Sequence, residues 1–406
     1  MKFSTYFIIF IFSNTLFAGG WIQKADFPAD ARHRTVGIAI SNKAYVGLGH
    51  YNGAGINVLF NDWWEYDPST NSWTQKADYL GGLCYDAVGF TIDNFGYVGT
   101  GRTSSVGSIL VQDFFKYNPI TNSWVAIAPF TGTGRRGAVS FVINEKAYVG
   151  TGETNLGRVK SFYKYDPNID SWTQIADMAG NSRTASVGFS IGNYGYVGTG
   201  DLFSGPSNDF WQYNPNTDSW IQKSNVGPLM RQEATGFELE GKGYILTGQN
   251  NDLGINYSDM WEYNPNSDLW SKISDFQGTA RRYLTSIVLS NDVYVGLGTN
   301  GVNFCDWWIY DKYLSTLEQN IEQNKIEVYP NPTSNFIICD FNFNGDFEIE
   351  NTYIELTNSS GKLVKRKKIN QSQTKIEVND LPPGTYHYHL NYKNYNLRRK
   401  KLIITK

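Results

Sequence analysis

Charged and aromatic residues recur at two positions of a repeating pattern, in a different combination each time. The first position lies thirteen residues after a recurring Trp, and the second follows the last Gly of a glycine-rich segment. The first position is occupied by Arg34, Asp86, Gly137, Ala185, Glu233 and Tyr283. The second position is occupied by His50, Arg102, Glu153, Asp201, Gln249 and Thr299. Carboxyl groups beside guanidinium groups can bind a polar or anionic ligand and can transfer protons.

Nine of these residues are the predicted ligand-binding residues. They are Arg34, His50, Asp86, Arg102, Glu153, Asp201, Glu233, Gln249 and Tyr283. If the chain is an enzyme, Glu233 or Glu153 is the candidate acid-base group. The alternative interpretation is a solvated polar rim that binds nothing. Aromatic residues near the second position could stack on sugar rings or could fill the loops: Tyr51, Phe60, Phe203, Tyr257 and Phe304.

The positions belong to a repeat of 48 to 52 residues that occurs six times. Its landmarks are a Trp, a Tyr 24 residues later in a segment such as "YVGTG", and a second Tyr that usually begins "YDP" or "YNP". The Trp residues are Trp21, Trp73, Trp124, Trp172, Trp220 and Trp270. A period near 50 is typical of propeller blades. We expect four strands in each repeat, as in "ASVGFSI", "YGYVGTG", "DFWQY" and "SWIQK".

These landmarks resemble kelch repeats and cover residues 19 to 312. The resemblance implies an all-β fold, a six-bladed β-propeller. The sixth repeat has Leu317 where Trp is expected, and the stretch "GGWIQKADFP" (19–28) is a fourth strand without the other three. We therefore expect this N-terminal strand to complete the last blade and close the ring.

Strand order places both positions on one face, at the mouth of the central channel. The distance between the two Tyr landmarks varies from 16 to 21 residues, so the loops on this face vary most in length. Variable loops on a rigid frame are common binding sites. In kelch proteins that bind peptides, the equivalent place often contacts the ligand.

Five arginines occupy another repeat position, eleven residues after the Trp, where the second repeat has Cys84. They are Arg32, Arg135, Arg183, Arg231 and Arg281. In five of the repeats the third strand begins with an acidic residue, and in the remaining repeat Ser161 takes this place. The acidic residues are Asp62, Asp113, Asp209, Asp259 and Asp306. We expect structural pairing between the two sets. The alternative is a basic ring for an anionic ligand.

Two kinds of enzyme are the catalytic alternatives for this pattern. Copper oxidases that resemble galactose oxidase need two His and two Tyr at the metal, with a Cys joined to one Tyr, and the only histidines of the repeats, His33 and His50, both lie in the first repeat. We therefore predict no metal and no cofactor. A mutarotase that resembles the kelch N-acetylneuraminate epimerases needs an acid-base group and a cation for the carboxylate. Glu233 or Glu153 with Arg34, Arg102 or Arg231 could serve.

The N-terminal residues 1–18 are predicted to be a signal peptide, because Lys2 precedes a short apolar run and Ala18 precedes Gly19. A membrane anchor is the alternative, but the run is short for a span. No other transmembrane segment is expected. The three cysteines form no framework, although a bridge between Cys84 and Cys305 was considered. The formal net charge of -3 gives no reason to expect nucleic-acid binding.

Residues 325–406 read as a second domain, a small β-sandwich after a linker at 313–324. The motifs "YPNP" (329–332), "SSGKLV" and "LPPGTY" (381–386) and the basic final strand resemble the type A C-terminal sorting domain of the type IX secretion system. This implies the type IX machinery as a partner, and a protein secreted to the medium or to the outer surface of a Gram-negative bacterium. We expect a secreted module that binds a carbohydrate or a protein, with a sialic acid mutarotase as the alternative.

Overall fold

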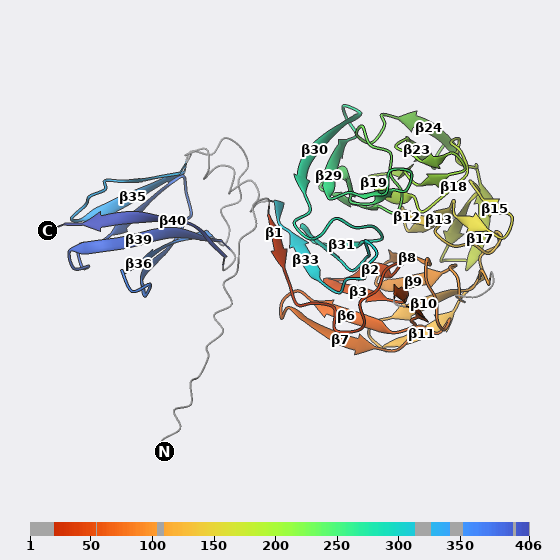
Figure 1. Cartoon of the computed structure of the whole chain (residues 1–406), viewed down its shortest axis with the longest axis horizontal. Helices are drawn as coiled ribbons and strands as arrows, with labels where there is room; N and C mark the ends of the chain where they lie inside the picture. Colours follow the sequence, from red (N-terminus) through yellow and green to blue (C-terminus); the bar gives the residue numbers. More distant parts are fainter. Residues whose placement is uncertain are drawn as a thin grey trace, which may run out of the picture. The chain divides into compact units, whose positions relative to one another are not determined.

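The computed structural model describes residues 20–53, 55–103, 109–312, 326–341, 352–392 and 395–405. The predicted signal peptide (1–18) and linker (313–324) lie outside these ranges. The chain divides into two compact units, Gln23–Tyr310 and a second that includes Asp311–Lys406. The first unit is a ring of sheets (Figure 1).

Within the described residues the ring contains six four-stranded sheets. Five of them are built from strands taken in chain order, and the sixth takes one strand from the N-terminus. The first three sheets are β2 (Val36–Ile40), β3 (Lys43–Gly47), β6 (Trp63–Asp67) and β7 (Ser72–Lys76); β8 (Val88–Ile92), β9 (Phe95–Gly99), β10 (Phe114–Asn118) and β11 (Ser123–Ala126); β12 (Val139–Ile143), β13 (Lys146–Gly150), β16 (Phe162–Asp166) and β17 (Ser171–Ile175). The next two are β19 (Val187–Ile191), β20 (Tyr194–Gly198), β23 (Phe210–Asn214) and β24 (Ser219–Lys223); β25 (Thr235–Leu239), β26 (Lys242–Leu246), β29 (Asp259–Asn264) and β30 (Leu269–Asp275). The sixth is β31 (Thr285–Leu289), β32 (Asp292–Gly296), β33 (Trp307–Tyr310) and β1 (Trp21–Gln23).

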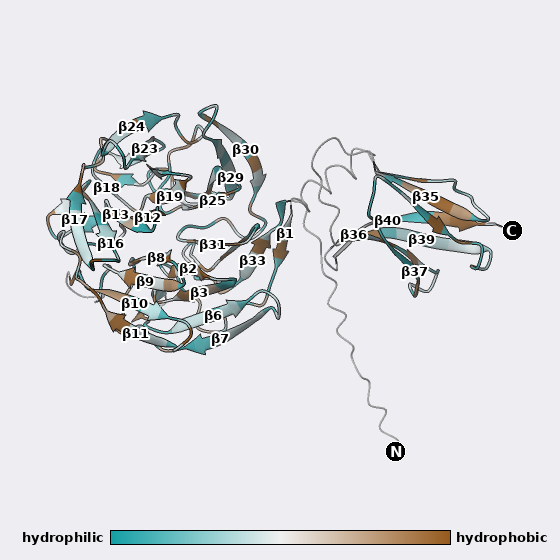
Figure 2. Ribbon diagram, turned by 180° about the vertical axis from the view of Figure 1, so that it is seen from behind, coloured by the Kyte–Doolittle hydropathy of each residue, from teal (hydrophilic) through white to brown (hydrophobic). Residues whose placement is uncertain are grey.

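The first strand of each sheet lies nearest the centre of the ring (Figure 1). These strands contact one another in a closed cycle, from β2 through β8, β12, β19, β25 and β31 back to β2. They alternate buried and half-buried residues, as β2 does with Val36, Ile38 and Ile40 buried. Figure 2 shows the same strands around the centre of the ring from behind. They also approach closely, because a Cβ on Gly37 would collide with Thr285 of the neighbouring sheet. The predicted all-β propeller is confirmed.

The N-terminal strand completes the sixth sheet, in the order β1-β33-β32-β31. Beyond β1, the amide of Lys24 donates to the carbonyl of Trp307 and the amide of Phe27 to that of Cys305, each at 2.8 Å. Trp21 and Phe27 are 1% and 2% exposed. The stretch that stands alone at the front of the sequence therefore supplies the strand that the sixth repeat lacks.

Five of the six recurring Trp residues join their own repeat to the one before. The indole Nε1 of Trp73 donates to the carbonyl of Ala25 at 2.9 Å, and the amide of Ala25 donates to Asn71 Oδ1, also at 2.9 Å. Asn71 in turn accepts the hydroxyl of Tyr66 at 2.8 Å. The same indole bond recurs from Trp124 to Ala77, Trp172 to Ala128, Trp220 to Ala176 and Trp270 to Ser224. The landmarks of the sequence are thus the residues that hold neighbouring sheets together.

Short strands in the loops form hairpins outside several of the four-stranded sheets. They are β4 (His50–Gly53), β5 (Ile56–Leu59), β14 (Glu153–Thr154), β15 (Gly157–Arg158), β18 (Arg183–Thr184), β21 (Asp201–Leu202), β22 (Gly205–Pro206), β27 (Gln249–Asn250) and β28 (Ile255–Asn256). All of them lie next to the second position of the repeat or to the residues that pair with it.

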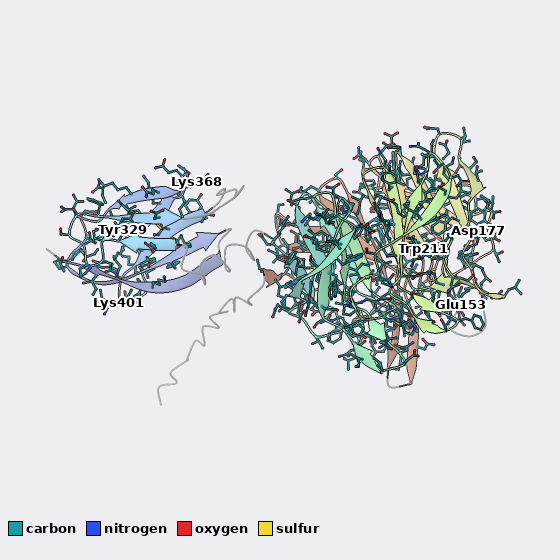
Figure 3. The ribbon with its side chains drawn as sticks, turned by 90° about the horizontal axis from the view of Figure 1, so that it is seen from above. Glu153, Asp177, Trp211, Tyr329, Lys368 and Lys401 are labelled. Carbon is teal, nitrogen blue, oxygen red and sulfur yellow. The ribbon has the colours of Figure 1, made fainter. Side chains whose placement is uncertain are left out.

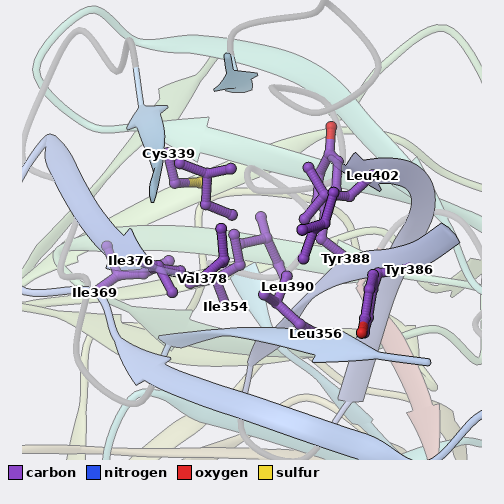
Figure 4. Packing of buried hydrophobic residues seen from close by; sticks show 12 residues of the cluster. Cys339, Ile354, Leu356, Ile369, Ile376, Val378, Tyr386, Tyr388, Leu390 and Leu402 are labelled. Atoms are coloured by element: carbon purple, nitrogen blue, oxygen red, sulfur yellow. The ribbon is translucent and has the colours of Figure 1, made fainter. Parts of the chain in front are cut away.

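The C-terminal unit consists of two sheets around an apolar core, as expected for a small β-sandwich. One sheet is β34 (Ile326–Tyr329), β35 (Phe336–Phe341) and β38 (Gln373–Glu377). The other has the order β37 (Leu363–Lys368), β36 (Thr352–Thr357), β39 (Gly384–Tyr392) and β40 (Tyr395–Ile404). Ile354, Leu356 and Leu402 of the second sheet pack with Cys339 and Ile376 of the first (Figure 4).

The described residues include no helix that is long and apolar enough to cross a membrane. Cys84, Cys305 and Cys339 are all free, so the bridge considered between Cys84 and Cys305 is not formed.

Removal of residues 19–28 tests the closure of the ring. We expect the chain that begins at residue 29 to lose at least about 5 kcal/mol of unfolding free energy relative to the chain that begins at residue 19, because two large buried aromatic side chains are lost. Denaturant unfolding measures the difference. Gln23→Ala, which changes an exposed residue of β1, is the control and should have little effect. Equal stability of the two chains would show that the strand does not close the ring.

Candidate ligand-binding site

All six residues at the first position have a left-handed backbone, with φ from 52° to 60°. This conformation is uncommon for residues other than glycine, and here five of the six have side chains. Backbone hydrogen bonds from one repeat to the next hold this conformation. The bonds run from Asp86 N to Arg34 O (3.2 Å), Gly137 N to Asp86 O (3.0 Å), Ala185 N to Gly137 O (2.9 Å), Glu233 N to Ala185 O (2.9 Å) and Tyr283 N to Glu233 O (2.8 Å). We call these six residues the mouth.

The mouth borders a cavity of about 120 Å³. Its remaining lining comes from the residue that follows each mouth residue: Thr35, Ala87, Ala138, Ser186, Ala234 and Leu284. A second space of about 240 Å³ is lined by the first strands of the sheets, mostly by small residues such as Gly37, Ala87 and Ser140. A ligand at the mouth would therefore meet variable side chains at the rim and small, uniform ones beneath.

The second position lies directly beside the mouth. In every repeat it pairs with the residue that precedes the mouth residue, and we call that residue the third position. The pairs are His33 with His50, Tyr85 with Arg102, Arg136 with Glu153, Thr184 with Asp201, Gln232 with Gln249 and Arg282 with Thr299. Sequence reasoning missed the third position. Its signal was present, since this position also varies between the repeats, with only Arg occurring twice.

Glu233 is an enclosed carboxyl group of the mouth, with a side chain 9% exposed, and the side chain of Asp86 is similarly enclosed at 8%. Tyr283 donates its hydroxyl to Glu233, and Gln249 donates Nε2 to Oε2 at 2.6 Å. Arg282 places Nε 3.1 Å from the same Oε2. Burial raises the pKa of Glu233 above its ordinary value of 4.5, while the bond from Tyr283 and the charges of Arg34 and Arg282 partly oppose the rise. The carboxyl group therefore keeps its proton to a higher pH than an exposed glutamate.

A second cluster joins Arg34, Asp86, Arg136 and Glu153. Arg34 forms an ion pair with Asp86, and Arg136 Nη1 lies 3.5 Å from the same carboxylate. Arg136 Nη2 also lies 2.5 Å from Glu153 Oε2 (Glu153 is labelled in Figure 3). The guanidinium of Arg34 stands over the ring of Tyr283, 4.1 Å from its centroid, and so connects this cluster to Glu233.

His33 and His50 form an uncharged part of the wall. Burial lowers the pKa of His33 to about 4, and it also lowers the pKa of His50. His33 stacks on Tyr283 with ring centroids 5.6 Å apart, and His50 stacks on Tyr85 at 4.8 Å. Both imidazoles are therefore neutral at neutral pH and act as polar, aromatic surface.

The predicted site residues thus fall into two groups. Arg34, Asp86, Glu233, Gln249 and Tyr283 are joined by direct contacts, and Glu153 joins them through Arg136. The other three lie further along the rim: His50 beside Tyr85, Arg102 paired with Tyr85, and Asp201 in an ion pair with Arg158. Within the described ranges, no three His, Cys, Asp or Glu side chains are grouped as metal ligands would be.

The five repeated arginines are structural. Each is at most 1% exposed. Four pair with the acid that opens the third strand of their repeat: Arg32 with Asp62, Arg183 with Asp209, Arg231 with Asp259 and Arg281 with Asp306. The fifth, Arg135, donates to the hydroxyl of Ser161 at 3.1 Å. None of the five lines the cavity of the mouth. Arg231, considered above as a cation for a mutarotase, is therefore part of the frame.

Glu233 should make stability depend on pH. Its pKa is raised in the folded state, so above about 4.5 the unfolded chain releases a proton that the folded chain retains, and stability falls as the pH rises through this window. Glu233→Gln should remove this loss, so that the variant gains stability relative to the wild type as the pH rises above about 4.5. Thermal unfolding across the pH range measures it. Glu145→Gln, at an exposed carboxyl, controls for lost charge, and parallel pH profiles of wild type and Glu233→Gln would contradict the assignment.

Part of the chain is similar to enzymes that act on an acidic sugar. A stretch of 122 residues is 38% identical to N-acetylneuraminate epimerase of Escherichia coli K12, over 29% of this chain and 31% of the relative. A stretch of 123 residues is 36% identical to N-acetylneuraminate epimerase 2 of Escherichia coli O6:H1 (strain CFT073), again over 29% and 31%. The chain thus spans about a third of the length of the curated relatives it matches. In fold it resembles the solved structure of YjhT, with a TM-score of 0.60 and 18% identity over 71% of this chain and 95% of that one.

Two families match the chain itself. Residues 327–405 match the secretion system C-terminal sorting domain, which confirms the type IX sorting domain and implies export by the type IX secretion machinery. Residues 90–298, just over half of the chain, match the KLHDC2/KLHL20/DRC7 Kelch-repeats domain. The chain is therefore a member of the kelch-repeat family with a C-terminal sorting domain of the type IX secretion system.

Proposed function

We propose that this chain is an exported kelch propeller whose mouth binds a carbohydrate that carries a carboxylate. The observation that carries the proposal is a group of three guanidinium groups beside the enclosed carboxyl of Glu233. Arg34 lines the cavity, and Arg136 and Arg282 stand behind it against the lining carboxyl groups of Asp86 and Glu233. A guanidinium group binds a carboxylate through two parallel hydrogen bonds. When Glu233 is protonated, these three cations face only two carboxylates, Asp86 and Glu153, and an anionic ligand would restore the balance.

A sugar suits this site better than a peptide does. The cavity is small, and charged and phenolic groups from four of the six repeats border it, as the polar groups of a sugar require. Neutral imidazole, amide and phenol groups accompany the charges, at His33, Gln249 and Tyr283. The local similarity to N-acetylneuraminate epimerases supports an acidic sugar, and N-acetylneuraminate is the natural first probe.

The sorting domain supports binding outside the cell. After transfer across the outer membrane of a Gram-negative bacterium, the propeller would be released or held at the outer surface. There it would meet the glycans of its surroundings rather than free metabolites of the cytoplasm.

Isothermal titration of the full chain with N-acetylneuraminate tests the binding. Arg34→Gln should weaken binding at least about tenfold, since a charge-assisted pair with the ligand carboxylate is lost. Binding should also weaken as the pH rises above about 4.5 and Glu233 ionises, and Glu233→Gln should flatten this dependence. Lys272→Gln, on the outer strand β30, is the control. Binding of a protein but of no acidic sugar would overturn the proposal in favour of a protein ligand.

A mutarotase is the second candidate, and the enclosed Glu233 is the observation that favours it. Opening a sugar ring requires a proton for the ring oxygen as its bond to the anomeric carbon breaks. A base must also take the proton of the anomeric hydroxyl, and ring closure on the other face reverses both transfers. A protonated Glu233 would supply the first proton, and Asp86 or Glu153 would accept the second. No metal or cofactor is needed for this chemistry.

Proton NMR of anomer exchange tests the catalytic candidate. If the chain is a mutarotase, it should accelerate exchange between the anomers of N-acetylneuraminate, and Glu233→Gln should lower this rate at least about a hundredfold while binding persists. The rate should survive EDTA. Binding without acceleration would leave the binding function alone.

A further inference from the structure

In two consecutive repeats, the third and the fourth, the mouth residue has little or no side chain. Gly137 and Ala185 share the left-handed backbone of their neighbours, with φ of 58° and 52°, but have no side chain beyond Cβ. The other four mouth residues have larger side chains that contact one another: Arg34, Asp86, Glu233 and Tyr283. A ligand larger than the cavity would therefore extend over Gly137 and Ala185.

Two linked hairpins stand beside Gly137 and Ala185. Hairpin β14–β15 begins at Glu153, which pairs with the residue before Gly137, and hairpin β21–β22 begins at Asp201, which pairs with the residue before Ala185. Arg158 of the first hairpin lies 2.5 Å from the carboxylate of Asp201 on the second. Val159 also bridges to Arg183 of β18, the strand that pairs with β21. The pair forms a continuous ledge outside the mouth.

Phe203 lies at the turn of the second hairpin and is 90% exposed. The guanidinium of Arg158 stands 5.5 Å from the centroid of its ring. Three other loop aromatics instead cover the structural arginines: Phe60 over Arg32 (3.6 Å), Tyr257 over Arg231 (4.8 Å) and Phe304 over Arg281 (3.7 Å). Phe203 is therefore positioned by a neighbour yet leaves its ring available. An aromatic ring offers a large contact area at low entropic cost, because only two torsions are fixed.

We propose that the mouth binds the terminal acidic sugar of a longer glycan, and that the next sugars pass over Gly137 and Ala185 and stack on Phe203. This proposal rests on the sugar binding proposed above. Binding of such a glycan end also differs from mutarotase catalysis. A terminal acidic sugar that is linked through its anomeric carbon has no free anomeric hydroxyl, and so cannot exchange anomers while it remains attached.

The test compares two probes by isothermal titration of the full chain: N-acetylneuraminate alone, and sialyl-lactose, in which the same sugar ends a trisaccharide. The wild type should bind the trisaccharide more tightly. Phe203→Ala should weaken trisaccharide binding about five- to tenfold and leave the free sugar within about twofold, since one stacking contact is removed. Ala185→Tyr should block the trisaccharide and spare the free sugar. Tyr283 shows that a tyrosine is accommodated at this backbone geometry.

Leu253→Ala is the matched control. Leu253 is 63% exposed in the turn of the corresponding hairpin β27–β28, beside the occupied sector of Glu233, and its loss should change neither affinity. Unfolding temperatures verify that every variant is folded. Equal effects of Phe203→Ala on both probes, or on neither, would overturn the path over the ledge. A wild type that binds neither probe would instead overturn the proposed sugar binding, and this inference with it.

Discussion

The left-handed conformation of the six mouth residues is the constraint on which the site depends. A left-handed residue other than glycine costs roughly 1–2 kcal/mol, so the surrounding structure must impose it. Here the amide and carbonyl groups of successive mouth residues impose it by bonding from one repeat to the next. Because the backbone alone does this, the side chain takes no part in the frame. One position can therefore hold Arg, Asp, Gly, Ala, Glu and Tyr in turn without loss of the ring.

The arginines show the same separation between frame and site. Arg183 and Arg231 meet an acid of their own repeat, at the same place in each sheet, and are fully buried. Removing one partner of such a pair costs more than the pair itself contributes, because a buried charge is left alone. Arg34, Arg136 and Arg282 have partners that differ from repeat to repeat and side chains 19% to 26% exposed. A ligand can compete for these arginines at a cost that the structural ones would not permit.

The repeated features could be predicted from the sequence because they occur many times. The period, the Trp landmarks and the N-terminal strand all followed from spacing, since each position is tied to the same neighbours in every copy. The contacts of the site occur once, and spacing within a repeat does not reveal them. Sequence reasoning considered Arg231 beside Glu233, yet the structure joins Glu233 to Arg282 and Tyr283 of the next repeat. Their proximity follows from the close contact of neighbouring first strands around the ring.

The distribution of side chains around the mouth argues for a ligand that is held at one end. The polar network of the fifth, sixth, first and second repeats borders one side of the cavity, as the proposed recognition of a charged group requires. The third and fourth repeats have no side chain beyond Cβ at the mouth, and the fourth carries an exposed aromatic ring outside it. A site for a free monosaccharide gains nothing from an open side, because contacts on that side are given up. An open side is useful when the ligand continues beyond the cavity, so the asymmetry favours recognition of a chain end over turnover of a free sugar.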